Sequence, residues 1–294
     1  MKHNLCRFSL KKLSPEQRNT ILNDAGVERL MRKYNFINSV YNSKKKEWYQ
    51  TAYMMILRTM DAGANKEVYF RLGEQIPFIW ILRELQSITS IEALLLGGAG
   101  LLDICPDDDY INKLREQWQH LSKKYRLSSL HHSEWHFTKI RPINHPVLRL
   151  AQVAMLLHNR EFLIDQILEC QTVDDIVELF ETEASEYWHS HFLVKKNLAS
   201  IPKRLGREKS LLLGINLVVP LQFAYSFFIG QQHMRQRAFN ILDAIPAENN
   251  RYIRAWKLQG VMPINAFESQ AIIQIATEYC QKGRCEECFV TKNM

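Results

Sequence analysis

Residues 211–229 read Leu-Leu-Leu-Gly-Ile-Asn-Leu-Val-Val-Pro-Leu-Gln-Phe-Ala-Tyr-Ser-Phe-Phe-Ile and contain no charged side chain. A stretch of this length can cross a bilayer as a helix. Asn216, Pro220 and Gln222 lie in its middle, however, and long polar sequence flanks it on both sides. A helix that is apolar all round lies either in a membrane or in a protein core. We therefore expect a buried, proline-kinked central helix and no membrane partner.

Helix signals dominate the rest of the 294-residue chain. Ser14-Pro15-Glu16-Gln17 combines an N-cap serine, a first-turn proline and a capping-box glutamine. Thr89 and Glu92 have the spacing of a second capping box, and Asp107 or Asp108 can cap a further helix. Alternating strand patterns separated by Asn-Gly or Asp-Gly turns are absent, so a substantial sheet is not expected. The sequence predicts an all-α, multi-helix globular array.

Apolar spacing also places the individual helices. It predicts them at Val27–Tyr41, Glu47–Met60, Pro77–Gln86, 89–102, Val147–His158, 211–229, Arg235–Ile245, Asn250–Gln259 and Ala266–Cys280. Gly97-Gly98-Ala99-Gly100 lies inside such a pattern, which favours close helix packing over phosphate binding. The most irregular stretch is 127–146. We place a domain boundary there, between a basic N-terminal part (1–126) and a C-terminal part with a cysteine tail (127–294); one continuous domain is the alternative.

The net charge of +7 is concentrated at the N-terminal end. Residues 1–50 hold eleven Lys and Arg against four Asp and Glu. The run Lys44-Lys45-Lys46 is the densest block, and aromatic residues are interleaved with the basic ones, at Tyr34, Phe36, Tyr41, Trp48 and Tyr49. Such a pattern suits a nucleic-acid backbone with stacked bases. The alternative is a solvated helical face whose aromatic side chains point into the core.

Three of the six cysteines lie within nine residues, at Cys280, Cys285 and Cys288. The spacing C-x4-C-x2-C suits zinc or an iron–sulfur cluster and matches the start of a plant-type iron–sulfur run. A fourth ligand would come from a distant cysteine or from a histidine of the 131–136 or 189–191 groups. The alternatives are a redox-active Cys285/Cys288 pair and three reduced thiols. No secretory signal is evident at residues 1–13, so the cysteines indicate a cytoplasmic protein.

Several short motifs, taken in order, are similar to those of a known family. They are Glu92-Ala-Leu-Leu-Leu-Gly-Gly-Ala-Gly100, Arg141-Pro-Ile-Asn-His-Pro-Val-Leu-Arg149-Leu-Ala-Gln152, Tyr187-Trp-His-Ser-His191, Ile215-Asn-Leu-Val-Val-Pro220, Glu248-Asn249, Ser269-Gln270-Ala271 and the stretch from Tyr279 to Cys288. From about residue 20 to the end, the chain resembles an uncharacterised bacterial family, common in Bacteroidota, called domain of unknown function 2851. Gly98 and His145 depart from the glutamine and the aromatic residue expected there.

The resemblance implies that this chain corresponds to the C-terminal, helical part of longer relatives. It also implies that the Arg141–Arg149 stretch and the cysteine tail belong to the family pattern, and it supplies no established activity. Physically, Arg141-Pro142-Ile143-Asn144-His145-Pro146 is a rigid loop that enters a helix at Val147. Arg141 and Arg149 can clamp a phosphate or carboxylate, with Asn144 and His145 beside them. Alternatively, both arginines pair with acids of residues 161–186.

Serine-hydrolase, P-loop, zinc-protease and dinucleotide-binding signatures are all absent, so the case for an enzyme is thin. The leading hypothesis is a non-catalytic helical module that binds nucleic acid or a protein partner through Arg141, Arg149 and the basic N-terminal region. Its cysteine tail would hold a structural zinc or iron–sulfur centre. One alternative is an enzyme or accessory subunit that uses Arg141, His145 and nearby acids on a phosphate-containing substrate. A metal-free helical scaffold is the other.

Overall fold

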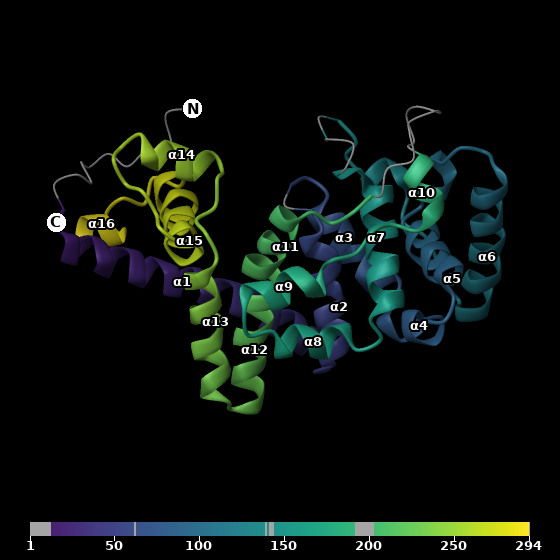
Figure 1. Ribbon diagram of the computed structural model, residues 1–294, viewed down its shortest axis with the longest axis horizontal. Helices are drawn as coiled ribbons and strands as arrows, with labels where there is room; N and C mark the ends of the chain where they lie inside the picture. The colour runs from purple at the N-terminus through teal and green to yellow at the C-terminus, as the bar shows by residue number, and fades with distance from the viewer. Residues whose placement is uncertain (1–12, 62, 139, 141–143, 192–202, 294) are drawn as a thin grey trace. The chain divides into compact units, whose positions relative to one another are not determined.

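The predicted all-α fold is confirmed by a computed structural model of the protein, which describes residues 13–293 except 62, 139, 141–143 and 192–202 (Figure 1). Every named element among these residues is a helix. Two isolated β-bridges, Glu183 with Arg204 and Pro246 with Asn265, are the β contacts in the part of the chain described.

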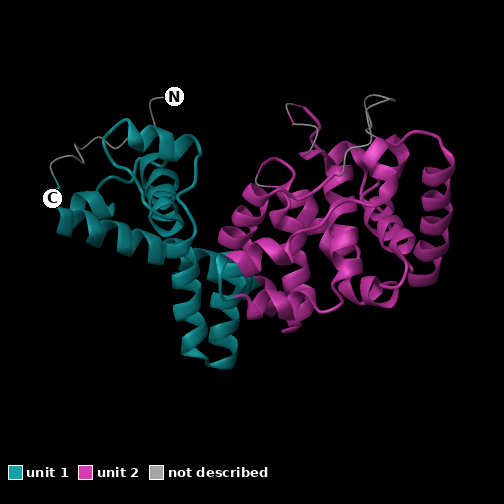
Figure 2. Ribbon diagram, viewed as in Figure 1, with its two compact units in different colours: residues 1–39, 171–173, 218–294 teal, residues 40–170, 174–217 magenta. Residues whose placement is uncertain are grey.

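The chain forms two compact units, shown in different colours in Figure 2. The first comprises residues 1–39, 171–173 and 218–294, and the second comprises 40–170 and 174–217. Each unit is therefore assembled from segments that are far apart in the sequence. The boundary expected at 127–146 lies inside the second unit, and the division of the chain into independent domains stays a prediction.

The first unit is built from the two ends of the chain. Its helices are α1 (Pro15–Ser43, whose last residues belong to the second unit), α12 (Val219–Ile229), α13 (Gln232–Ala244), α14 (Arg251–Lys257), α15 (Ala266–Gln274), the π-helical continuation η8 (Ile275–Cys280) and α16 (Phe289–Lys292). The α12 helix packs against α13, and α15 packs against both α13 and α14.

The start of α1 has the predicted capping box. The backbone N–H of Gln17 donates to Ser14 Oγ (3.1 Å), and the backbone N–H of Ser14 donates to Gln17 Oε1 (2.9 Å). Two helices were expected here, the second beginning at Val27, but α1 is continuous through Gly26. The ring of Phe267 occupies the space that a Cβ at Gly26 would need, so this glycine serves close packing and does not end the helix.

The second unit contains most of the short helices. Those wholly or mainly within it are α2 (Trp48–Thr59), α3 (Lys66–Gln75), α4 (Phe78–Arg83), α5 (Ile88–Glu92), η3 (Ala93–Gly97), η4 (Leu102–Ile104), α6 (Asp109–Tyr125), η5 (His132–Glu134), α7 (Pro146–Asn159), α8 (Leu163–Glu169), α9 (Val173–Leu179), α10 (Glu186–Ser190), α11 (Arg207–Leu213) and η7 (Gly214–Val218). The α7 helix is buried along almost its whole length and packs against α5 and η3.

The predicted apolar helix is present and begins at Arg207 instead of Leu211. It runs through α11, η7 and α12 to Ile229, and 67% of its most apolar window is buried. Among the described residues it is the one helix that is long and apolar enough to cross a membrane. The π-helical turn η7 directly precedes α12, whose first turn contains Pro220. Proline lacks a backbone N–H and cannot continue a regular hydrogen-bond ladder. The buried central helix is thus confirmed.

Candidate anion-binding site

Arg149 lies in the first turns of α7, in the second unit. Pro146 occupies the first helical position, where its missing N–H costs nothing. His145 is the N-cap residue, and its Nδ1 accepts weakly from the backbone N–H of Val147 (3.4 Å). The remaining α7 sequence is almost entirely apolar, so the helix is drawn into the core and carries the arginine with it.

The Arg149 guanidinium is buried, and no carboxylate among the described residues contacts it. Only 5% of the residue is exposed. Its Nη1 donates to Gln152 Oε1 (2.8 Å), its Nη2 donates to Asn144 Oδ1 (2.5 Å), and its Nε, also buried, has no hydrogen-bond partner in the part of the chain that the structure describes. Gln152 is itself held by a bond to the Lys203 carbonyl (2.8 Å). Neutral amides therefore orient the guanidinium, and the negative charge of Asp61 acts on it only through space.

A second cation, Lys209 of α11, lies close enough for its charge to act on Arg149. Its ammonium donates to the backbone carbonyls of Thr59 (2.8 Å) and Met60 (3.0 Å) at the end of α2. The pKa of Lys209 is lowered to about 7, chiefly by burial and also by the positive charge of Arg149, while the negative charge of Asp61 acts in the opposite direction. Lys209 is thus a cation whose charge is costly to keep.

Asp61 is the acid that acts on both cations, and it does so through space. Its carboxylate accepts from the backbone N–H groups of Gly63 and Asn65, both at 2.9 Å. No ion pair joins it to Arg149 or Lys209 in the described part of the unit. The Asp61 carboxylate, which is already hydrogen-bonded to backbone N–H groups, is thus the one acid that acts on both cations among the described residues. The first turn of α7 adds the positive end of its helix dipole. The surroundings favour an additional anion.

Two of the predicted anion-binding residues, Asn144 and Arg149, lie together in the structure, whereas His145 has a structural role. Asn144 and Arg149 are hydrogen-bonded, as a shared site requires. His145 caps α7, stacks on Phe137 (5.3 Å between ring centroids), and has its pKa lowered by burial, which favours the neutral ring. Arg141 lies outside the described residues. The alternative reading, a pair with acids of residues 161–186, is wrong for Arg149, because neutral amides take that place.

The side chains of the predicted basic region differ in their surroundings, and some contact other residues while others are exposed to solvent. Lys44 forms an ion pair with Glu74 (2.7 Å), and Lys45 and Lys46 have positive φ in the turn after α1. Tyr34 is partly buried and packs against Phe227, which is 37% exposed, with ring centroids 4.6 Å apart, so the choice between core packing and base stacking stays open. Binding of nucleic acid at Lys44, Lys45 and Lys46 stays a prediction.

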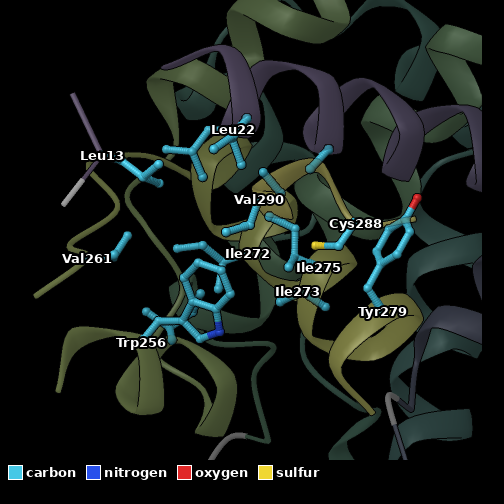
Figure 3. Close-up of a cluster of buried hydrophobic side chains, with 14 residues drawn as sticks. Leu13, Leu22, Trp256, Val261, Ile272, Ile273, Ile275, Tyr279, Cys288 and Val290 are labelled. Atoms are coloured by element: carbon cyan, nitrogen blue, oxygen red, sulfur yellow. The ribbon is translucent and has the colours of Figure 1, made fainter. Parts of the chain in front are cut away.

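The three cysteines of the tail differ in their surroundings. Cys288 is 4% exposed and packs in the hydrophobic cluster of the first unit, where Figure 3 shows it beside Tyr279 and Val290. Cys280 and Cys285 are partly exposed. The described residues include no group of three His, Cys, Asp or Glu that could hold a metal ion, so the side chains as arranged do not fit the predicted centre. Metal binding itself stays a prediction.

This arrangement predicts an order of thiol reactivity. Burial raises the pKa of Cys288, and the thiolate is the reactive species, so Cys288 should be alkylated only on unfolding, whereas Cys280 and Cys285 should react in the native protein. Iodoacetamide labelling followed by peptide mass spectrometry measures this. Protection of all three cysteines until a chelator is added would contradict the prediction and support the metal centre, as would stoichiometric zinc or iron that is lost in Cys285→Ser.

A buried carboxyl group at the end of α5 was missed by sequence reasoning. Glu92 is fully buried and accepts from Tyr110 (2.8 Å), Ser185 (2.7 Å) and the Trp188 ring nitrogen (3.1 Å). The capping-box interpretation of Thr89 and Glu92 is wrong, because α5 is capped two residues earlier by Ser87. The motifs that contain Glu92 and Trp188 are far apart in sequence, and they meet here.

The second pair of distant motifs meets in the first unit. Ser269 and Gln270 both donate side-chain hydrogen bonds to the carboxylate of Glu248. Gln270 also accepts from Arg29 Nε (3.2 Å), which ties α15 to α1. These motif residues therefore hold helices together, and the signal that singles them out in the sequence is polarity within apolar helices.

Comparison with known proteins gives a single result. The model of a family described as a protein of unknown function (DUF2851) matches residues 1–251, which include Glu92, Arg149 and Trp188. No curated protein and no solved structure matches the chain. The match ends before Cys280, so the inclusion of the cysteine tail in the family pattern stays a prediction.

Proposed function

This chain belongs to the DUF2851 family of proteins of unknown function, and we propose that its second unit binds a phosphate-bearing ligand through Arg149 and Lys209. The observation that carries the proposal is the buried Arg149 guanidinium, which has neither a carboxylate partner nor a hydrogen-bond partner for its Nε among the described residues. A buried charge without a counter-ion is strongly unfavourable, so a protein retains one where a ligand offsets the cost.

The arrangement suits a phosphate better than a carboxylate. Arginine presents its N–H groups in a planar fork that matches two oxygens of a phosphate, while a lysine beside it acts as a point charge. The two cations together favour a dianion, and Asn144 and Gln152 hold the fork in one orientation. The proposal concerns binding and assigns no reaction. Nucleic acid, a phosphorylated protein and a small phosphate ester are all sources of the required group.

Calorimetric titration with inorganic phosphate and pyrophosphate tests the proposal. Arg149→Met should weaken binding at least about tenfold, because it removes a charged, partly pre-oriented donor worth about 1.5–3 kcal/mol. Arg207→Met is the matched control, since Arg207 lies on the neighbouring α11, is 62% exposed at its side chain and contacts Asp174 only at 3.8 Å. Equal weakening in both variants, or no binding by the unmodified protein, would overturn the proposal. Circular dichroism checks that the variants are folded.

The pH dependence of binding gives a separate prediction. Because the pKa of Lys209 in the free protein is lowered to about 7, the ammonium is present at pH 6 and largely lost at pH 8.5. An anion binds the protonated form better, so affinity should fall as pH rises through about 7, by at most about tenfold per pH unit. Sulfate is the suitable probe, since its own charge does not change over this range. Lys209→Met should flatten the profile, and an unchanged slope in that variant would exclude Lys209.

A further inference from the structure

Three large apolar side chains project from one short segment of the first unit. Leu258 is 86% exposed, Met262 is 70% exposed and Ile264 is 78% exposed. Single exposed apolar residues are common on protein surfaces, but a group of such residues within one segment marks an interaction site. The segment follows α14 directly and leads into α15.

The local conformation explains why these side chains face outward. Residues 261–264 alternate between buried and exposed, as an extended segment does, with Val261 and Pro263 inside and Met262 and Ile264 outside. Val261 lies in the hydrophobic cluster together with Trp256 of α14 (Figure 3). The segment is therefore anchored to the unit by one face and presents the other.

The exposed face of α14 adds positive charge beside the apolar residues. Arg251, Arg254 and Leu258 have helical spacing that places them on one face, opposite the buried Ile253 and Trp256. The stretch from 249 to 264 contains three cations, the third being Lys257, and no acid. The cations form no ion pair among the described residues; Arg251 donates to the Tyr252 hydroxyl (2.6 Å) and Arg254 donates to Asn249. The nearby carboxylate of Glu268 accepts from the backbone N–H of Ile264 (2.9 Å).

We propose that this surface, defined by Arg251, Arg254, Lys257, Leu258, Met262 and Ile264, binds the face of an anionic lipid bilayer. Projecting apolar side chains next to unpaired cations are the combination that enters the boundary between headgroups and acyl chains and attracts anionic lipid. Side chains that project this far can each insert separately into the boundary between headgroups and acyl chains, which favours a lipid surface as the partner. The expectation of no membrane partner rested on the apolar stretch 211–229, which lies in a mostly buried helix; binding at the surface is a different mode.

Sedimentation of the full chain with vesicles tests this proposal. Vesicles of phosphatidylcholine with about one third phosphatidylserine should bind the protein, and pure phosphatidylcholine vesicles should bind it at least about tenfold less. A triple variant with Leu258→Ser, Met262→Ser and Ile264→Ser should lose at least about tenfold in affinity. A second triple variant, with Arg251→Gln, Arg254→Gln and Lys257→Gln, should lose affinity at low salt and become insensitive to added salt.

Two control variants come from the second unit. Phe162→Ser removes a side chain that is 62% exposed, and Lys113→Gln removes an exposed lysine, so neither should change vesicle binding. Failure to sediment, equal binding to both vesicle types, or equal loss in the controls would each overturn the proposal. Cross-linking from position 262 to a second copy or to another protein, without lipid binding, would show a protein interface in its place. None of these results depends on Arg149.

Discussion

Replacing Gly100 with alanine should destabilise the second unit by about 3 kcal/mol. Gly100 has φ of +67°, a conformation that costs an alanine about 1–2 kcal/mol. An added Cβ would also collide with the backbone carbonyl oxygen of Leu130, and a backbone cannot move aside as a flexible side chain can. Leu130 is held there by its own N–H, which donates to the Gly98 carbonyl (2.8 Å). Urea unfolding followed by tryptophan fluorescence measures the loss.

Two other glycines distinguish the cost of the positive φ from the cost of the collision with Leu130. Gly230 has nearly the same φ, +71°, but open space around it, so Gly230→Ala should show the conformational cost alone, about 1–2 kcal/mol. Gly206 lies in the second unit with ordinary φ and nothing near a Cβ, so Gly206→Ala should be close to neutral. Equal unfolding midpoints for Gly100→Ala and Gly206→Ala would contradict the close approach of Leu130.

Replacing Glu92 with leucine should cost about 3 kcal/mol, because one buried donor and two partly buried donors lose their acceptor at once. The ring N–H of Trp188 would remain buried without a partner, and the partly buried hydroxyls of Tyr110 and Ser185 would lose their shared acceptor. Urea unfolding again gives the measurement, with Glu116→Leu on the exposed face of α6 as the matched control. A stability equal to that of the unmodified protein would mean that these donors are not tied to Glu92 in solution.

The protonation of Glu92 adds a pH dependence to this comparison. Burial raises the pKa of Glu92, and the three hydrogen bonds oppose that rise. A folded-state pKa above the unfolded one stabilises the protein in acid, and the gain is lost as pH rises through the folded value. The stability advantage of the unmodified protein over Glu92→Gln should therefore be largest near pH 4 and should shrink as the pH rises toward neutral.

Local signals in the sequence were sufficient for much of the fold. The Ser14–Gln17 capping box, the Asp108 cap of α6 and the apolar run that ends at Ile229 each act over a few residues, so they can be predicted without tertiary information. The glycine run at 97–100 is likewise explained by close packing, since a Cβ at Gly97 would meet the ring of Trp118.

The remaining features depend on contacts between distant segments. The α3 and α8 helices were not predicted, and α3 is stabilised by packing on α2, with Gly73 against Met54. Glu92 has a capping-box spacing that is indistinguishable in sequence from a real one, and its three donors come from α6 and the region of α10. The neutral partners of Arg149 are local, with Asn144 five residues before it and Gln152 three residues after it, but Lys209 and Asp61 come from distant segments, so the anion site could be predicted only in part.

The Nε–H group of Arg149 gives the most direct measurement of the central claim, that this buried cation binds a phosphate. Proton–nitrogen correlation spectra resolve arginine Nε–H groups, and Arg149→Met assigns the resonance by its disappearance. Because this N–H has no partner among the described residues, titration with inorganic phosphate should move its resonance downfield and slow its exchange with water, while the Arg207 resonance stays in place. An Arg149 resonance that is unchanged at saturating phosphate would contradict the account.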